Sequence, residues 1–388
     1  MKNKIIKFGI LDGLYWAYYA VFIGFCTTYF LEYGMTTTEM SLIVVLFMIF
    51  AMIGSFFFGS VRDALRTNKK VFIPLLVIVT IVSIAEIIAC QKNMRLLFFI
   101  HPLLAFFVSS LGTSIDVWML KEFDNDADAF GKARAVGSVG YAIVMLICSK
   151  VYEKLGYSYM TWILIVTTIL VIISASSCEE TKFSSVTRTK LDISATKELF
   201  KIPDYTIMIF ILFFSGLSTT SISSLKTVFL QAVGGNVATL GIDSFAGVMA
   251  QSLFIFISGQ ISKINAKTRL LMSTICVFFT LLFNLLATSP FLIICGTVMA
   301  NISYGIILPT MREITERSVP AKFTNVAHSI GDIMYGNMCG IIGLSYSGIL
   351  IDKYGTKSIV VLGLFIIIIP FALNLLYYKV GKKEKVTC

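Results

Sequence analysis

The chain has 388 residues, of which 57% are hydrophobic and only 14% charged, and its mean hydropathy is +0.86. Soluble domains carry about 25% charged residues, so this composition excludes a water-soluble fold and indicates an integral membrane protein. The eight cysteines lack paired spacing and there are two histidines, so nothing points to a disulfide framework or a metal site. We expect no metal and no bound cofactor, apart from a possible coupling proton.

The chain contains roughly twelve apolar stretches that reach the length of about 20 residues needed to cross a bilayer. We therefore predict an all-α membrane protein with roughly twelve transmembrane helices. The predicted spans are 8–31, 38–60, 71–90, 96–120, 133–152, 158–177, 205–230, 242–262, 269–288, 291–310, 323–349 and 358–378.

One long polar segment, 178–204, interrupts this series and predicts a cytoplasmic linker between two six-helix bundles, 1–177 and 205–388. The first stretch begins with lysines, as a signal peptide does. It offers no small-x-small cleavage site, so we expect it to be retained as a helix.

Lysine and arginine are concentrated in the segments on one side of the predicted spans, the side that holds both chain ends and the linker. Cytoplasmic loops carry this excess, so we predict that both termini are cytoplasmic in a multi-pass protein of the cell membrane. The net charge of +10 is then largely a topology signal. It gives no reason to expect a nucleic-acid partner.

The first predicted helix carries polar and aromatic side chains at helical spacing, including Asp12, Trp16 and Tyr19. They could form one wall of a substrate cavity, or they could pack against neighbouring helices. Asp12 favours the cavity, because a carboxylate in contact with lipid is costly.

The segment "GSVRDALRTNKK" (59–70) joins the second and third predicted spans. With the twelve spans and the long central segment, it resembles the major facilitator superfamily, whose loop reads roughly G-x-x-x-D-[RK]-x-G-[RK]-[RK]. The alternative is a cationic loop that serves orientation alone. The matching positions are Gly59, Asp63, Lys69 and Lys70, whereas Ala64 and Arg66 depart from the pattern.

Asp116 and Arg134 lie in consecutive predicted helices, each nine positions from Asn125 in the connecting hairpin. Equal offsets on antiparallel helices place the two side chains at similar depth, at most about 13 Å from the turn at about 1.5 Å per residue. An unpaired charge there costs about 2.5–3.5 kcal/mol, so we expect them to pair.

Arg134, Ser138 and Tyr141 follow at i, i+4 and i+7 and share one helical face. A guanidinium, a hydroxyl and an aromatic ring on one stripe suit a sugar ring, because neighbouring hydroxyls need both donors and acceptors. The alternative is a structural ion pair, or an arginine that only marks the end of the helix.

The stretch "FGKARAVGSVGY" (130–141) closely resembles the lactose permease branch, the oligosaccharide:proton symporters. In that family helix four carries an acidic residue and helix five begins FGRAR, followed by G-x-V-G and an aromatic residue. The resemblance implies that Asp116 is the sugar-binding carboxylate and Arg134 its partner. Tyr141 takes the place of the tryptophan on which the sugar ring stacks.

The family's proton-handling positions on helix ten correspond here to Ala300 and Ser303, so proton coupling does not carry over. His328 and Asp332 lie one turn apart on the predicted eleventh helix and offer a substitute, since imidazole titrates near neutrality. We predict that Asp332, with His328, carries a coupling proton. The alternative is helix packing, with Asp332 paired to Lys226.

Two further acidic residues, Glu86 and Asp243, lie near predicted outer helix ends, where we expect them at the interface. The cytoplasmic end of the tenth predicted helix is strongly charged and is expected to be a gate or a topology element. Its charged residues are Arg312, Glu313, Glu316 and Arg317.

The leading prediction is a secondary transporter that moves a sugar or oligosaccharide by alternating access, with the lipid bilayer and the solute as its partners. The first alternative is the same fold with a nucleoside, an aromatic acid or an exported organic compound as solute. The second is a membrane enzyme, because His328 and Asp332 match an HxxxD pattern; such pairs are common in helices, and we expect no enzyme. Oligomeric state is not indicated by the sequence.

Overall fold

A computed structural model describes residues 2–124, 126–181 and 197–383, and every regular element within them is helical. In this part of the chain, 12 helices are long and apolar enough to cross a membrane, which confirms the predicted all-α architecture. Several helices run past the predicted spans; the second span was predicted to end at residue 60, but its helix continues to Leu65. Apolarity ends at the bilayer boundary, whereas a helix ends at its cap.

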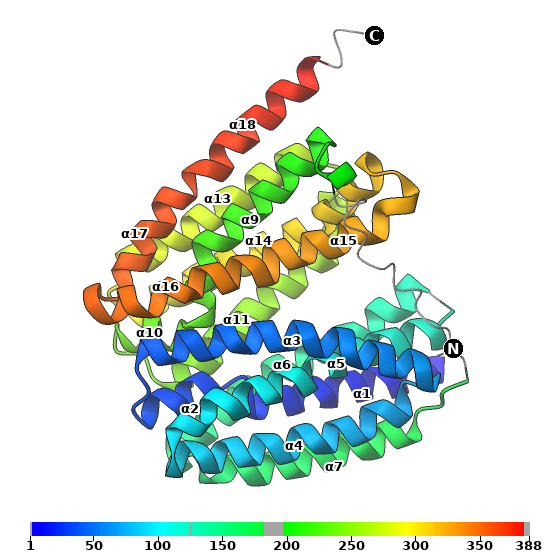
Figure 1. The fold of residues 1–388 in the computed structure, drawn as a ribbon, viewed down its shortest axis with the longest axis vertical. Helices are drawn as coiled ribbons and strands as arrows, with labels where there is room; N and C mark the ends of the chain where they lie inside the picture. The colour runs from blue at the N-terminus through cyan, green and yellow to red at the C-terminus, as the bar shows by residue number, and fades with distance from the viewer. Residues whose placement is uncertain (1, 125, 182–196, 384–388) are drawn as a thin grey trace. The chain divides into compact units, whose positions relative to one another are not determined.

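The described residues of the first half form seven helices and two 3-10 segments, and Figure 1 shows how these helices are arranged. They are α1 (Lys2–Phe22), α2 (Cys26–Glu32), α3 (Thr37–Leu65), α4 (Lys69–Lys92), η1 (Met94–Leu96), α5 (Leu97–Glu122), α6 (Ala127–Leu155), η2 (Tyr157–Tyr159) and α7 (Met160–Ser177).

The second half contains the remaining helices, with a π-helical segment, η4, within the eleventh span. They are α9 (Pro203–Ser224), α10 (Lys226–Gln231), α11 (Val237–Phe256), α12 (Ser258–Ile261), α13 (Ala266–Leu286), α14 (Pro290–Ser318), η3 (Ala321–Phe323), α15 (Thr324–Asp332), η4 (Ile333–Met338), α16 (Cys339–Tyr354), α17 (Thr356–Ile366) and α18 (Ile368–Lys383).

The chain divides into two compact units. Unit 1 comprises Met1–Thr187 together with Gly235–Phe245, and unit 2 comprises Arg188–Gly234 together with Ala246–Cys388. The start of α11 therefore belongs to unit 1, although the sequence assigns it to the second bundle. Much of the predicted linker, residues 182–196, lies outside the described residues.

Local sequence sets the ends of the helices that frame unit 1. Thr36 and Glu39 form a capping box at the start of α3, and Arg66 closes that helix in the left-handed conformation at φ 50°. The acidic hairpin before α6 has a similar role, because Asp126 accepts hydrogen bonds from the backbone N–H groups of Asp128 and Ala129.

Close helix packing forms the interior of unit 1. In this unit α1 packs along α6, and α4 and α7 run side by side (Figure 1). A Cβ atom on Gly140 would lie 2.5 Å from the carbonyl oxygen of Gly13, so the α1–α6 contact requires a residue without a side chain there. Large apolar side chains face outward, as a lipid-facing surface requires. Trp162, for example, is 68% exposed.

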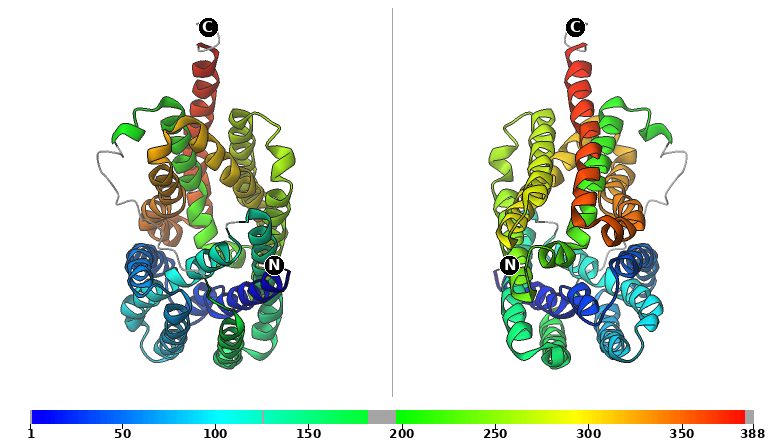
Figure 2. Two further views of the ribbon diagram at one scale, coloured as in Figure 1. Left: turned by 90° about the vertical axis from the view of Figure 1, so that its right-hand side faces the viewer. Right: turned by 90° about the vertical axis from the view of Figure 1, so that its left-hand side faces the viewer.

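In unit 2, α9 is the central helix and contacts α13, α14, α16, α17 and α18. Tyr205 on α9 is fully buried, and its hydroxyl donates to the carbonyl of Ala327 in α15. Figure 2 shows α13 and α14 side by side. Tyr205 belongs to a cluster of buried apolar side chains from α9 and its neighbours, whose close packing stabilises the unit.

The predicted loop motif at 59–70 is held by the segment that follows α7. The Glu180 carboxylate accepts hydrogen bonds from the Thr67 hydroxyl and the backbone N–H of Asn68, each at 2.5 Å. Lys69 donates to the carbonyls of Ser176 and Cys178 at 2.7 and 2.8 Å. The motif is thus fixed to the end of the sixth span, a contact that the sequence did not reveal.

The other predicted members of the loop motif lie on or beside these helices. Gly59 is buried and Asp63 half-buried on α3, whereas Lys70 is exposed in the first turn of α4. Their predicted role in conformational change stays a prediction.

Candidate functional site

Arg134 lies between two carboxylates in unit 1. Its Nη1 is 3.4 Å from Asp12 Oδ2, and its Nε is 3.6 Å from Asp116 Oδ1. Asp12 is fully buried, whereas the side chains of Arg134 and Asp116 are 31% and 36% exposed. The predicted Asp116–Arg134 pair is present, and Asp12 adds a second carboxylate that the sequence did not assign to Arg134. We call Asp12, Asp116 and Arg134 the charged cluster.

The positions of Asp116 and Arg134 along their helices explain why their side chains are close. Asp116 lies six residues before the end of α5 at Glu122, and Arg134 lies seven residues after the start of α6 at Ala127. At about 1.5 Å per residue both lie about 10 Å from the hairpin. The equal depth that the sequence predicted is therefore what brings the guanidinium to the carboxylate.

Gly137 allows α1 to approach this point on α6. A Cβ atom on Gly137 would collide with Asp12 Oδ2 and would lie 2.7 Å from Trp16 Cδ1 and 2.8 Å from Arg134 Nη1. No side chain larger than hydrogen fits without moving one of these groups. The glycine is thus part of the construction of the charged cluster.

The aromatic residues of α1 divide into two sets. Trp16 and Tyr19 are half-buried, and the Arg134 guanidinium carbon lies 4.7 Å from the centre of the Trp16 ring. Tyr15 and Tyr18 are fully buried, and the Tyr18 hydroxyl is 3.2 Å from Thr80 on α4. A cavity-wall role for Trp16 and Tyr19 stays a prediction, whereas the packing interpretation suits the other two.

The predicted stripe on α6 is present as a row of half-buried residues. Arg134, Ser138 and Tyr141 all have intermediate exposure, and the Tyr141 ring lies 6.5 Å from Trp16 in an edge-on arrangement. Tyr141 thus extends the aromatic surface of Trp16 rather than contacting the arginine. A role for Ser138 in binding stays a prediction.

Unit 2 contains a polar cavity of about 420 Å³. Tyr304 on α14 and Tyr335 in η4 stack across it, with ring centres 6.0 Å apart and planes inclined by 26°. None of the described residues that line this cavity is charged, and we call it the neutral cavity. Its lining residues are Gly216, Thr219, Thr220, Ser223, Gln251, Val277, Ala300, Asn301, Tyr304, Tyr335 and Gly336.

The sequence singled out none of the polar residues of the neutral cavity. The available signal was weak: uncharged hydroxyls and carboxamides are common in membrane helices, where they hydrogen-bond within their own helix. The π-helical segment that carries Tyr335 also indicates a functional site here, because such segments are frequent at functional sites.

The structure gives His328 and Asp332 separate partners on α14. Both carboxylate oxygens of Asp332 accept from Arg312 Nη2, at 2.9 and 2.8 Å, and His328 Nε2 lies 2.9 Å from Glu316 Oε1. The Asp332 side chain is half exposed. The charged end of α14 therefore pairs with α15. The proton role of Asp332 and His328 stays a prediction.

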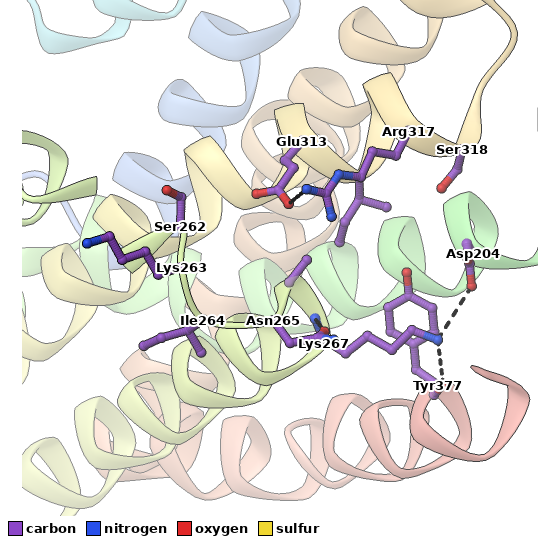
Figure 3. A pocket seen from close by; sticks show the side chains of 12 residues that line it. Asp204, Ser262, Lys263, Ile264, Asn265, Lys267, Glu313, Arg317, Ser318 and Tyr377 are labelled. Carbon is purple, nitrogen blue, oxygen red and sulfur yellow. Dashed lines mark hydrogen bonds and ion pairs between the residues drawn. The ribbon is translucent and has the colours of Figure 1, made fainter. Parts of the chain in front are cut away.

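A second pocket, of about 340 Å³, lies beside this charged end (Figure 3). Lys267 contacts Asp204 at 3.8 Å and lies 3.9 Å from the centre of the Tyr377 ring, and Arg317 pairs with Glu313 at 2.9 Å. Glu313 also pairs with the buried Arg269. Since both acidic side chains here are already paired with cations, we assign the pocket to helix-end packing.

Two expectations about interfacial acids are wrong. Glu86 is 0% exposed and Asp243 is 2% exposed, so both lie inside the protein. Glu86 contacts the buried His101 of α5, with Oε1 and Nδ1 2.5 Å apart. Nearness to a predicted helix end suggested an interfacial position, but the side chain of Glu86 points into the bundle.

Within the described residues, no group of three or more His, Cys, Asp or Glu side chains could hold a metal ion.

No curated protein matches the chain in sequence. Solved structures similar in fold include the nucleoside transporter NupG, at 16% identity and a TM-score of 0.79 over 97% of this chain and 99% of that chain. They also include a bacterial homologue of the human lysosomal transporter Spinster, at 12% identity and a TM-score of 0.71 over 97% of both chains. The sequence matches the MFS_1 like family over residues 8–362. The chain therefore belongs to the MFS_1 like family and has the fold of a major facilitator transporter.

Proposed function

We propose that the protein is a secondary transporter of a sugar or oligosaccharide in the cell membrane, working by alternating access and coupled to protons. The observation that carries the sugar assignment is the charged cluster, in which Arg134 lies between Asp12 and Asp116 and against Trp16. The guanidinium of Arg134 and the carboxylate of Asp116 are partly exposed, so they are available to a polar solute.

The cluster offers what neighbouring sugar hydroxyls need. A guanidinium has five N–H donors in a fixed fork, and a carboxylate has only acceptors, so a diol can donate to one and accept from the other. The Trp16 ring supplies an apolar face for the C–H side of a pyranose.

A specific observation favours a nucleoside as the second candidate. The neutral cavity combines the Tyr304–Tyr335 stack with the carboxamides of Gln251 and Asn301. A flat nucleobase would gain from stacking on tyrosine, and its edge would pair with carboxamide donors and acceptors. NupG, a similar structure, is a nucleoside transporter.

A competition experiment separates the two candidates. The protein is reconstituted in liposomes, and uptake of a labelled galactoside is challenged with galactosides, glucosides, sucrose and nucleosides. We expect sugars to compete and nucleosides to leave uptake unchanged. Uptake of a nucleoside that no sugar reduces would overturn the sugar assignment and support the second candidate. Failure to move any of these solutes would contradict both.

A further inference from the structure

A carboxyl group and an imidazole lie in contact within the apolar interior of unit 1, away from the charged cluster. Glu86 on α4 and His101 on α5 are 0% and 3% exposed, with Oε1 and Nδ1 2.5 Å apart. Ionisable residues inside membrane segments are costly, and where they occur they mark ion pathways and proton relays. Nothing in the proposed recognition of solute uses this pair.

The surroundings of the pair are apolar or weakly polar. From α2, Phe30 stands edge-on to the His101 ring at 5.5 Å, and from α3, Phe47 lies 4.8 Å from it. Besides His101, the thiols of Cys26 on α2 and Cys90 on α4 interact electrostatically with Glu86.

Two further titratable or charged side chains of the neighbouring elements are bonded to another group or exposed. Tyr29 on α2 donates its hydroxyl to the carbonyl of Ile87, and Arg95 on η1 is exposed. The facing groups carry no positive charge at neutral pH. The charge of the pair therefore depends on how many protons the pair itself holds.

One proton makes the pair electrically neutral, whether it resides on the imidazole or on the carboxyl. Without it, the pair carries one negative charge in an apolar site. Glu86 Oε2 is buried and has no hydrogen-bond partner, so an ionised carboxylate here would be poorly satisfied. The packed arrangement thus suits the state that holds one proton.

Position on the helices gives the proton a short route and a link to the solute. Glu86 lies six residues before the end of α4 and His101 four residues after the start of α5, about 9 and about 6 Å at 1.5 Å per residue. Loosening that end of the bundle would admit water to the pair. Helix α5 also carries Asp116 of the charged cluster, so movement of one helix affects both sites.

We propose that the Glu86–His101 pair binds the proton that moves with the solute, an inference that rests on the proposed transport function. With the proton bound, the ends of α4 and α5 pack as the structure shows. When water reaches the pair, the proton leaves and the negative charge is stabilised by hydration. Proton binding and the packing of this helix end are therefore linked.

The test measures solute and proton movement in liposomes that contain a pH-sensitive dye. The variant is Glu86→Gln, with Glu86→Asp as the conservative replacement that keeps a carboxyl group. Thr80→Val is the matched control, because Thr80 is a buried α4 residue whose hydrogen bonds to Tyr18 and Thr168 involve no titrating acid. Thermal unfolding confirms that each variant is folded.

We expect Glu86→Gln to exchange labelled for unlabelled solute at the parent rate but to lose proton movement and uphill accumulation. Glu86→Asp and Thr80→Val keep both. If Glu86→Gln does not fold, His101→Asn replaces it with the same expected result. A parent that moves no solute contradicts the proposed function and this inference with it. A parent and a Glu86→Gln variant that move solute and protons alike contradict this inference alone.

Discussion

The charged cluster of unit 1 and the neutral cavity of unit 2 differ in how their polar side chains are satisfied inside membrane-spanning helices. In the cluster, side chains of opposite charge satisfy one another across three helices. In the cavity, hydroxyls and carboxamides bond to backbone within their own helix, as Thr220 does to Gly216 and Asn301 to Thr297. Removing one charged side chain from the cluster therefore leaves its partners without a counter-charge. Removing one neutral side chain from the cavity leaves the hydrogen bonds of its neighbours intact.

The largest expected effect follows from removing the shared cation. Arg134→Ala leaves Asp12 and Asp116 without a counter-charge, and breaking a buried pair this way costs about 3 kcal/mol. We expect a strongly lowered unfolding temperature and loss of transport. Arg317→Ala is the control, since Arg317 is 73% exposed and a pair of this kind with Glu313 is worth less than about 1 kcal/mol. Equal destabilisation by the two substitutions would remove the distinction between the cluster and a surface ion pair.

A second substitution tests the packing that builds the cluster. Gly137→Ala places a methyl group against Asp12, Trp16 and Arg134, and such overpacking costs about 1–3 kcal/mol. Gly131→Ala, six residues earlier on α6, meets nothing within 4 Å and should be neutral or slightly stabilising. Chemical denaturation in detergent compares the two. A harmless Gly137→Ala would show that the close α1–α6 contact is not needed.

A smaller effect is expected in the neutral cavity. Tyr304→Ala removes half of the Tyr304–Tyr335 stack, and an aromatic pair is worth about 1 kcal/mol, or about fivefold in affinity. If a nucleobase binds there, nucleoside affinity falls by that factor while sugar affinity changes less. Equilibrium binding of both ligand classes measures this. Unchanged nucleoside affinity would argue against base stacking in this cavity.

The smallest effect is expected at the charged end of α14. Asp332→Asn removes a half-exposed partner of Arg312, so the loss of stability should stay within about 1 kcal/mol. Because we place the coupling proton at Glu86 and His101, we also expect solute accumulation to be kept. Loss of accumulation with normal exchange would instead support the proton role predicted for Asp332 from the sequence.

The twelve spans and the Asp116–Arg134 pair were predictable because both depend on local quantities. Span length follows from the thickness of the bilayer, and the pair follows from equal distances to one hairpin. The contact of Asp12 with Arg134 joins residues 122 positions apart, and no local pattern encodes it. It depends on how closely α1 packs on α6, which Gly137 permits.

The Glu86–His101 contact was missed for a related reason. Each residue is a single polar position in an apolar stretch, and sequence spacing does not say which face of α4 meets α5. Glu180 was missed because it follows the last turn of a span and binds the 67–69 segment far away in sequence. The Glu86–His101 contact depends on the rotation of one helix against another, and the Glu180 contact depends on the path of the chain after α7. Hydropathy carries no information about either.

The most direct measurement of the central claim is calorimetric sugar binding by purified parent and Arg134→Lys protein, with unfolding temperatures recorded in parallel. Lysine keeps the positive charge between Asp12 and Asp116 but loses the planar fork of donors. Recognition by the charged cluster predicts a folded variant whose sugar affinity falls at least about tenfold, or about 1.4 kcal/mol. A folded variant that binds the sugar as tightly as the parent would contradict it and leave the cluster a structural ion pair.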